Sequence, residues 1–316
     1  MIRPVAVQRL NAAYRGRARD ESYLELAQEH FLDWMREEGL LGDVVFKGGT
    51  SLRKFVFGLH GRFSHDLDFA TADRAVGELV IDALEVGFTH SGVAFSGWDI
   101  DRGALKAAWT AEAPGLGATR LACRLDFSTR PLMLAPVARA RAVLPSVTER
   151  DLGFAPAAPR VADLRETCAE KLARFRRVVF GRDVYDLSKL IPLIRDDVAL
   201  VRELLLYKVY FDVVDDDRGA APFEVGGEYS GKRVADVRAA DELGAMTGKP
   251  IDITAMLAVI EATFGSMAPA VLPKEAMLAR CNRGDRHRVQ SWHDQRCSEL
   301  RAGGAEASTS SQADLG

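Results

Sequence analysis

Two short motifs in the first quarter of the 316-residue chain contain residues suited to phosphate chemistry. The first is Gly48-Gly49-Thr50, which follows the short apolar run 44–46. A strand that ends in two glycines before a helix exposes backbone N–H groups with no side chain in the way, and such a turn can hold a triphosphate. The hydroxyl of Thr50 or Ser51 would add a donor to the same phosphate oxygens.

The second motif is Asp66-Leu67-Asp68. Residues two apart in a strand face the same side, so the two carboxylates form a hard oxygen site that suits Mg²⁺ bound to substrate phosphates. Two such ions can polarise an α-phosphate, activate an incoming hydroxyl and neutralise a pyrophosphate leaving group. This chemistry usually needs a third carboxylate on a neighbouring strand, and Asp126 in the strand-like run 119–128 is the candidate.

Each motif alone is common in turns and on solvated strands. Their order along the chain is strand, glycine turn, helix, turn and Asp-x-Asp strand, which is the order that nucleotidyl transfer needs. The combination therefore favours a metal-dependent nucleotidyltransferase.

A further charged group follows in the second half of the chain. Lys171 could reach a β- or γ-phosphate as a point charge, with Arg182 beside it for a forked contact. Asp183 and Asp186 would orient these cations or accept a hydrogen bond from a nucleotide hydroxyl. The alternative is a structural set in which the two aspartates hold Arg182 and Lys189 in place.

The elements that must position these residues follow from the hydrophobic pattern. Helices are predicted at 20–38, 51–59 and 75–87, and antiparallel strands at 93–100, 105–111 and 119–128. After an Ala- and Pro-rich loop at 152–159 the pattern becomes helical. We therefore predict an α+β protein with a mixed or antiparallel sheet domain over 1–155, a mainly helical C-terminal domain over 156–301 and a disordered tail over 302–316.

The composition is that of an ordinary soluble globular protein, with 47% hydrophobic and 28% charged residues. A net charge of -3 gives no global signature of nucleic-acid binding, although a local basic face would be sufficient for it. We expect no membrane segment, because no apolar stretch approaches the roughly 18 residues that one requires. The four cysteines form no C-x-x-C pair, so we expect free thiols in a reducing cytoplasm.

The motifs also belong to a longer pattern. The runs 46–54 and 62–69 resemble the first motif of the AbiEii-type nucleotidyltransferase toxins, and the runs 170–172 and 181–187 resemble their second motif. These toxins include the mycobacterial MenT group and belong to the polymerase-beta-like nucleotidyltransferase superfamily. The stretch between the glycine turn and Asp66 is longer than in the usual pattern, so we expect an extended or bent helix there.

The resemblance implies a toxin of a toxin–antitoxin system that uses an NTP with Mg²⁺ or Mn²⁺ and has a cognate antitoxin protein as partner. It also implies transfer to RNA, with the tRNA 3′ acceptor end as the leading target. The predicted catalytic residues are Asp66, Asp68, Asp126, Lys171 and Asp186, of which the first three would bind the metal. The predicted nucleotide-binding residues are Lys47, Gly48, Gly49, Thr50, Ser51, Ser64, Arg182 and Asp183.

Two other functions stay open. The same site could nucleotidylate or phosphorylate a protein target, since the apparatus that handles the nucleotide is shared. Alternatively, the chain could be a catalytically silent NTP-binding or antitoxin-like protein. The presence of all three aspartates argues against the silent protein, because loss of activity should remove carboxylates first.

Overall fold

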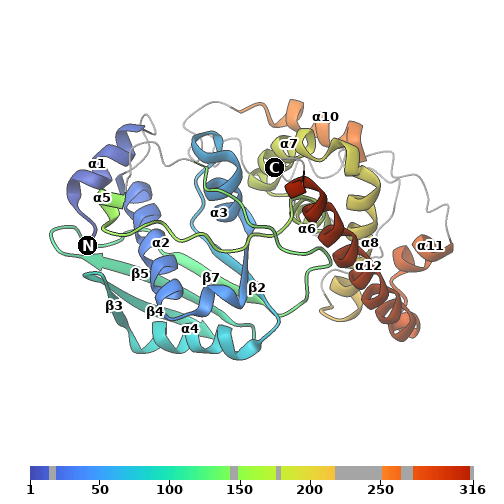
Figure 1. Cartoon of the computed structure of the whole chain (residues 1–316), viewed down its shortest axis with the longest axis horizontal. Coiled ribbons are helices and arrows are strands. Elements are labelled where there is room, and N and C mark those ends of the chain that lie inside the picture. The colour runs from blue at the N-terminus through green and yellow to red at the C-terminus, as the bar shows by residue number, and fades with distance from the viewer. Residues whose placement is uncertain (14–18, 143–148, 176–178, 218–250, 265–272, 314–316) are drawn as a thin grey trace. The chain divides into compact units, whose positions relative to one another are not determined.

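A mixed β-sheet forms the core of the N-terminal half of the chain in the computed structural model (Figure 1). The structure describes residues 1–316 except 14–18, 143–148, 176–178, 218–250, 265–272 and 314–316. The described residues form two units. The first contains Met1–Pro131 and Pro136–Ala162, and the second contains Leu132–Ala135 and the described residues from Asp163 onward. The main change of unit along the chain falls between Ala162 and Asp163.

The sheet has seven strands in the order β1-β2-β7-β5-β4-β3, and β6 pairs with β5. The strands β2 and β7 are parallel, and the other neighbouring pairs are antiparallel. The strands are β1 (Val44–Lys47), β2 (Leu67–Thr71), β3 (Phe88–His90), β4 (Val93–Asp101), β5 (Lys106–Ala113), β6 (Gly117–Ala118) and β7 (Cys123–Ser128). A mixed sheet followed by helices confirms the predicted α+β class.

Two long helices of the first unit begin and end close to the predicted positions. They are α2 (Arg19–Glu37) and α4 (Arg74–Val86). The side chain of Asp73 accepts a hydrogen bond from the N–H of Ala75 (2.9 Å) and so caps the N-terminus of α4. The other helical segments of this unit are α1 (Pro4–Ala13), η1 (Leu40–Gly42), α3 (Gly48–Leu52), η2 (Arg53–Phe57), η3 (Gly58–His60) and α5 (Glu149–Leu152).

The helices α2 and α4 cover one face of the sheet. The ring of Phe31 on α2 stacks on Trp109 of β5, with 5.0 Å between the ring centroids. Helix α4 lies so close to β4 that a side chain at Gly97 would press on it. Along β7 the opposite face is exposed or half-exposed at alternate positions. We call it the carboxylate face, because Asp68 and Asp126 lie on it.

The connection between the glycine turn and the Asp-x-Asp strand consists of three short helical segments of different pitch. The α-helical turn α3 is followed by η2, which is a π-helix, and then by the 3-10 helix η3. The extended or bent helix expected from the sequence therefore takes this form. Single π-helical turns are rare and occur frequently at functional sites.

The regular secondary structure described for the second unit is helical. Helix α6 packs against α7 and α8, and α7 packs against α10. The segments are α6 (Leu164–Phe175), α7 (Gly181–Leu190), η4 (Ile191–Leu193), η5 (Arg195–Asp197), α8 (Val198–Val214), α10 (Ile253–Phe264), α11 (Pro273–Arg280), η7 (Arg283–Asp285) and α12 (Arg286–Ala313). Helix α12 thus includes most of the segment 302–316, for which the sequence predicts disorder. Within the described residues, no helix of either unit has both the length and the apolar character needed to cross a membrane.

All four cysteines are free, buried thiols, as the sequence predicts. Burial raises the pKa of Cys297 to about 11, and it also raises the pKa values of Cys123 and Cys168. These thiols are therefore protonated at neutral pH, which makes them poor nucleophiles and poor metal ligands.

Candidate active site

Two of the predicted aspartates lie side by side in the centre of the sheet. The parallel strands β2 and β7 pair with Asp68 opposite Asp126, and neighbouring strands are about 4.8 Å apart. Both side chains are partly exposed on the carboxylate face. Asp66, also partly exposed, lies directly before β2. The fold thus brings Asp126 beside Asp68 from a strand that is far away in the sequence.

A row of alternating charges crosses the sheet at this level. Lys47 of β1 pairs in register with Asp68, and Lys106 of β5 pairs in register with Asp126. The Nζ atom of Lys106 lies 2.8 Å from Oδ2 of Asp126, and both side chains are partly exposed. Ion pairs of this kind contribute only about 0–1 kcal/mol, so a ligand can displace the lysine. The sequence analysis missed Lys106, because its place beside Asp126 depends on the strand order.

The glycine turn packs directly against charged and polar side chains. A Cβ atom on Gly48 would overlap Oδ2 of Asp68 and would lie 2.9 Å from its Cγ atom. A Cβ atom on Gly49 would overlap Nη2 of Arg62 and would lie 3.0 Å from Oγ of Ser64. Gly48 also has φ +76°, a conformation that other residues rarely adopt. Gly48 is therefore required for the close contact between this turn and the carboxylate strand, whereas a side chain at Gly49 would have to displace the end of the Arg62 side chain.

The hydroxyl groups of the turn are used inside the protein. Thr50 donates a hydrogen bond to the backbone carbonyl of Asp66, and Ser51 donates one to that of Phe46 (3.3 Å). Both side chains are buried. We expected these hydroxyls to donate to phosphate oxygens, whereas in the structure they hold the turn against β1 and the start of β2. The backbone N–H groups of the glycines are thus the stronger candidates for phosphate contact.

Gln28 of α2 supports the loop that carries Asp66. Its buried amide donates hydrogen bonds to the backbone carbonyls of Ser64 and His65, each at 3.2 Å. The same nitrogen lies 3.9 Å from Sγ of Cys123 at the start of β7. One side chain therefore contacts both segments that supply the carboxylates. The sequence offered only a weak signal for this role, namely a glutamine among the apolar residues of α2.

Buried ion pairs fix the π-helix η2 on α2. The guanidinium of Arg53 pairs with Glu25 (3.0 Å), and Nζ of Lys54 lies 2.7 Å from Glu29. Arg141 also contacts Glu29, at 2.6 Å. Burial alone would raise the pKa of Glu29, but the charges of Arg141 and Lys54 outweigh it and lower the pKa to about 2. Glu29 is therefore an anion at neutral pH and holds η2 in place.

In the second unit, the predicted residues Lys171, Asp183 and Asp186 form one buried ion cluster. The Nζ atom of Lys171 on α6 lies 2.9 Å from Asp183 and 2.8 Å from Asp186, both on α7. Arg174 adds a contact to Asp183 at 3.2 Å. The side chain of Lys171 is only 6% exposed. The aspartates thus orient Lys171, which is one of the arrangements that the sequence predicts, and Lys171 must leave them before it can bind a phosphate.

The other two cations of this segment lie against aromatic rings. The guanidinium of Arg182 is 4.7 Å from the ring centroid of Phe180, and Nζ of Lys189 is 5.1 Å from that of Tyr185. Arg182 lies at the start of α7, and the next residue in the sequence, Asp183, belongs to the ion cluster. Its predicted contact with a nucleotide stays a prediction.

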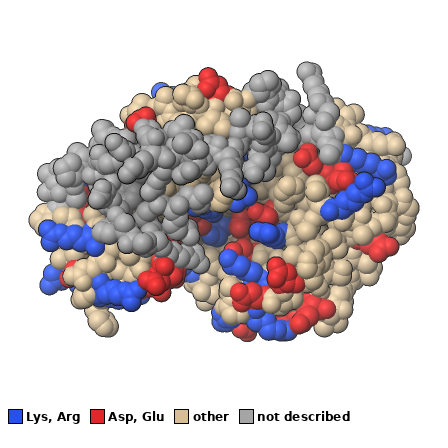
Figure 2. Space-filling view, turned by 180° about the vertical axis from the view of Figure 1, so that it is seen from behind, with Lys and Arg blue, Asp and Glu red and all other residues tan. Residues whose placement is uncertain are grey.

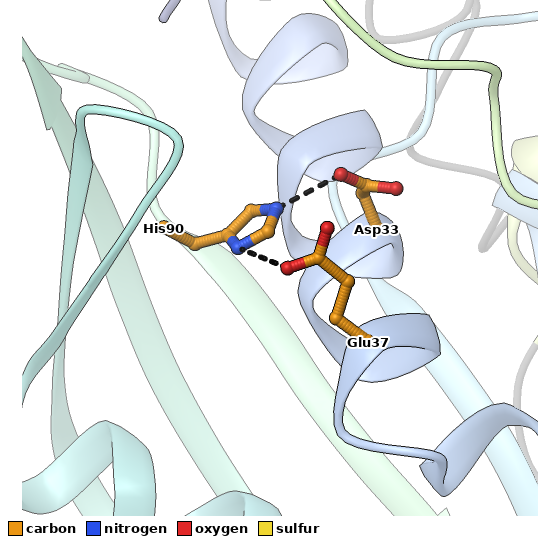
Figure 3. A group of neighbouring side chains, drawn as sticks. All are labelled: Asp33, Glu37 and His90. Atoms are coloured by element: carbon orange, nitrogen blue, oxygen red, sulfur yellow. Dashed lines mark hydrogen bonds and ion pairs between the residues drawn. The ribbon is translucent and has the colours of Figure 1, made fainter.

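A third group lies outside the predicted site. Among the described residues, one set of three His, Cys, Asp or Glu residues has potential ligand atoms that all lie within 4.8 Å of one another. These residues are Asp33, Glu37 and His90. Nε2 of His90 lies 2.9 Å from Asp33, and Nδ1 lies 3.6 Å from Glu37. Figure 3 shows the two carboxylates at different nitrogens of the ring. A metal would bind one nitrogen and draw both carboxylates to it, so this geometry fits a clamp between α2 and β3.

Asp66, Asp68 and Asp126 do not converge as closely in the part of the chain that the structure describes. The Nζ atom of Lys106 lies beside Oδ2 of Asp126. The donor set nevertheless fits a divalent metal, because three partly exposed carboxylates supply the hard oxygen ligands that Mg²⁺ takes. The turn at Gly48, which has no space for a side chain, lies against Asp68, so its backbone N–H groups are candidates for contact with the phosphates of a substrate.

The chain is similar to known nucleotidyltransferase toxins. Residues 32–259 match a family model described as nucleotidyl transferase AbiEii toxin, type IV TA system. Among solved structures, the chain is similar to MenT4, a nucleotidyltransferase toxin from Mycobacterium tuberculosis H37Rv, with a TM-score of 0.80 and 32% sequence identity. That similarity covers 95% of this chain and 99% of the MenT4 chain. No curated protein sequence gives a significant match.

Proposed function

The chain belongs to the AbiEii family of nucleotidyltransferase toxins, and from this premise we propose that it transfers a nucleoside monophosphate from an NTP to RNA. We take the 3′ acceptor end of tRNA as the target. Membership of a type IV toxin–antitoxin family implies an NTP substrate and an antitoxin partner. The observation that carries the proposal is the register of Asp68 with Asp126 beside the turn at Gly48.

We propose Mg²⁺ as the metal of this reaction, with Asp66, Asp68 and Asp126 as the residues that would hold it. When bound, a divalent ion neutralises charge on the triphosphate and on the departing pyrophosphate. Lys106 is the residue that must move away from Asp126 to make room for it, and the weak, partly exposed ion pair allows this.

The residues of the first unit then have distinct roles in the transfer. The backbone N–H groups of Gly48 and Gly49 bind the triphosphate, and Lys47 adds a positive charge beside it. Asp126 accepts the proton of the RNA 3′-hydroxyl while the oxygen of that hydroxyl bonds to the α-phosphorus. The bond between the α-phosphorus and the bridging oxygen breaks, and pyrophosphate leaves. The partly buried hydrogen bond from Thr50 to the Asp66 carbonyl keeps the turn and the carboxylates in fixed relative positions.

The cluster around Lys171 has two roles in this proposal. It anchors α7 on α6, because one cation joins Asp183 and Asp186 of α7 to α6. Lys171 binds a phosphate only after Asp183 and Asp186 release it. The anchoring role affects folding and the phosphate role affects the affinity for NTP, so the two can be measured separately.

The test is to incubate the protein with total tRNA, each α-³²P-labelled NTP and Mg²⁺, and to separate the products on a denaturing gel. We expect label in tRNA. The Asp68→Asn variant should lose more than about 100-fold in rate, since even disturbing an outer partner of a metal ligand costs about 10–100-fold. Asp82→Asn is the matched control, because it removes a carboxylate on α4 that pairs with Arg102 at the surface.

Three results would count against the proposal. Full activity of Asp68→Asn would remove this residue from the site. Label on a protein and none on RNA would favour the protein-target alternative, and γ-³²P label on that protein would indicate phosphorylation. No label on any acceptor, combined with no binding of NTP and Mg²⁺ in calorimetry, would favour a catalytically silent protein.

A further inference from the structure

Trp98 of β4 is unusually exposed on the carboxylate face of the sheet. Its side chain is 44% exposed, although tryptophan is highly buried on average. The strand register pairs Trp98 with Ala108 of β5, and Ala108 with Arg124 of β7. Trp98 and Arg124 therefore share one row across the sheet, and the alternation along β7 places Arg124 on the same face as Asp126.

This row lies next to the row of carboxylates. Arg124 and Asp126 are two residues apart on one strand, which corresponds to about 7 Å. Trp98 is two strands away from Arg124, which corresponds to about 10 Å. The two side chains are thus within reach of the nucleotides that precede a 3′ end held at Asp126.

The backbone beside Trp98 is irregular. The pairing of β4 with β5 shifts register between Trp98 and Asp101, and Asp99 has φ +52°. A left-handed conformation costs about 1–2 kcal/mol in a residue other than glycine. Irregularities of this kind redirect side chains and are frequent next to active sites. The left-handed conformation of Asp99, directly after the exposed tryptophan, therefore costs stability in β4.

Arg124 is a cation available for a ligand. Its side chain is exposed, and within the described residues its guanidinium has no acidic partner. By contrast, Lys106 on the same face pairs with Asp126. Figure 2 shows acidic and basic side chains lying together in mixed groups on one face of the molecule. An unpaired guanidinium matches the geometry of a phosphodiester.

The strand order decides which substrate meets these two residues. The glycine turn follows β1, at one edge of the sheet, whereas β7, β5 and β4 continue from the carboxylates toward the other edge. An NTP held at Gly48 therefore lies toward β1, and Trp98 lies on the opposite side of the carboxylates. The attacking and leaving oxygens of a phosphoryl transfer are roughly in line, so the acceptor must approach from the side opposite the pyrophosphate.

We propose that Trp98 and Arg124 bind the single-stranded 3′ end of the acceptor RNA. Trp98 stacks on a base, and Arg124 contacts a phosphate of the same strand. Aromatic and arginine side chains on an open sheet are a common means of holding single-stranded nucleic acid without strict sequence preference. The inference rests on the proposed function, which supplies RNA as the acceptor.

The experiment measures binding of a fluorescein-labelled single-stranded RNA dodecamer to the full chain by fluorescence polarisation, over a series of salt concentrations. We expect Trp98→Ala to weaken binding about tenfold, and Trp98→Phe to stay within about threefold of the parent, because a phenyl ring still stacks. Arg124→Gln should reduce the slope of log affinity against log salt by about 0.7, the value for one phosphate contact on a single strand.

Two matched controls separate this effect from general damage. Leu79→Ala removes an exposed apolar side chain of α4, which packs on the other face of the sheet. Arg102→Gln removes a surface cation that pairs with Asp82 and Glu85 of α4. Both should bind the dodecamer like the parent protein.

The outcome also distinguishes this inference from the proposed function. If the parent protein labels tRNA but Trp98→Ala and Arg124→Gln bind the dodecamer with parental affinity and salt slope, the inference is wrong and the proposed function stands. Trp98 would then be the contact of another partner, such as a protein. If the parent protein labels no RNA, the proposed function is wrong, and the dodecamer still decides whether this face binds RNA.

Discussion

Replacing Gly48 with alanine tests whether the turn and the carboxylate strand must touch for activity. The new Cβ atom would lie 3.0 Å from Cβ of Asp68 and 2.9 Å from its Cγ atom. Rotation of the Asp68 side chain cannot relieve the contact between the two Cβ atoms, because Cβ of Asp68 is bonded directly to the backbone of β2. Either β2 or the turn must therefore shift by a few tenths of an ångström.

The size of the effect follows from a comparison with Gly39. Gly39 has φ +74° and Gly48 has φ +76°, but nothing lies within 4 Å of a Cβ atom built on Gly39. Alanine in this left-handed conformation costs about 1–2 kcal/mol, so both variants should lose that much stability. Only Gly48→Ala also displaces Asp68. A displacement of about 1 Å in an active site costs on the order of 100-fold in rate, so we expect a loss of roughly 10- to 100-fold.

The assay combines urea denaturation with transfer of α-³²P label to tRNA under saturating NTP. We expect Gly39→Ala to be less stable but as active as the parent protein. Gly48→Ala should be folded and should have a much lower kcat. Equal activity of the two variants would refute the argument that close contact between the turn and Asp68 sets the geometry of the site.

Three further predictions concern the ion clusters and the metal. Replacing Lys171 with methionine leaves Asp183 and Asp186 without their shared cation, and breaking a buried pair in this way should cost about 3–5 kcal/mol in a urea titration. Parental stability would show that the cluster does not anchor α7. The pKa of Glu29 falls to about 2 in the folded protein, so its contribution to stability is complete above its ordinary pKa of 4.5 and is lost as the pH falls from there toward 2. Glu29→Gln should lack this pH-dependent component of stability, which is on the order of 3 kcal/mol. The variant should also be less stable at pH 7, because Lys54 and Arg141 lose their anion. An unchanged dependence of stability on pH below 4.5 would contradict this. Removal of divalent metal with EDTA should abolish label transfer without changing the thermal unfolding midpoint, and Mg²⁺ should restore it; transfer that persists in EDTA would count against the three aspartates as metal ligands.

The local part of the site was readable from the sequence. The spacing of Asp66 and Asp68, and the two glycines between an apolar run and a helix, depend on the geometry of a few consecutive residues. The α+β class and the family also followed, since hydrophobic periodicity and ordered motifs are properties of the chain itself. The catalytic and nucleotide-binding roles of individual residues stay predictions.

The tertiary structure decided which distant residues meet. Asp126 lies opposite Asp68 because β7 inserts beside β2, and stacking of Phe69 on Phe127 (5.2 Å between ring centroids) on the covered face holds that register. The same strand order brings Lys106 to Asp126 and separates Trp98 from the glycine turn. Strand order and register arise from packing among residues that are far apart in the chain, so a single sequence with local rules does not reveal them.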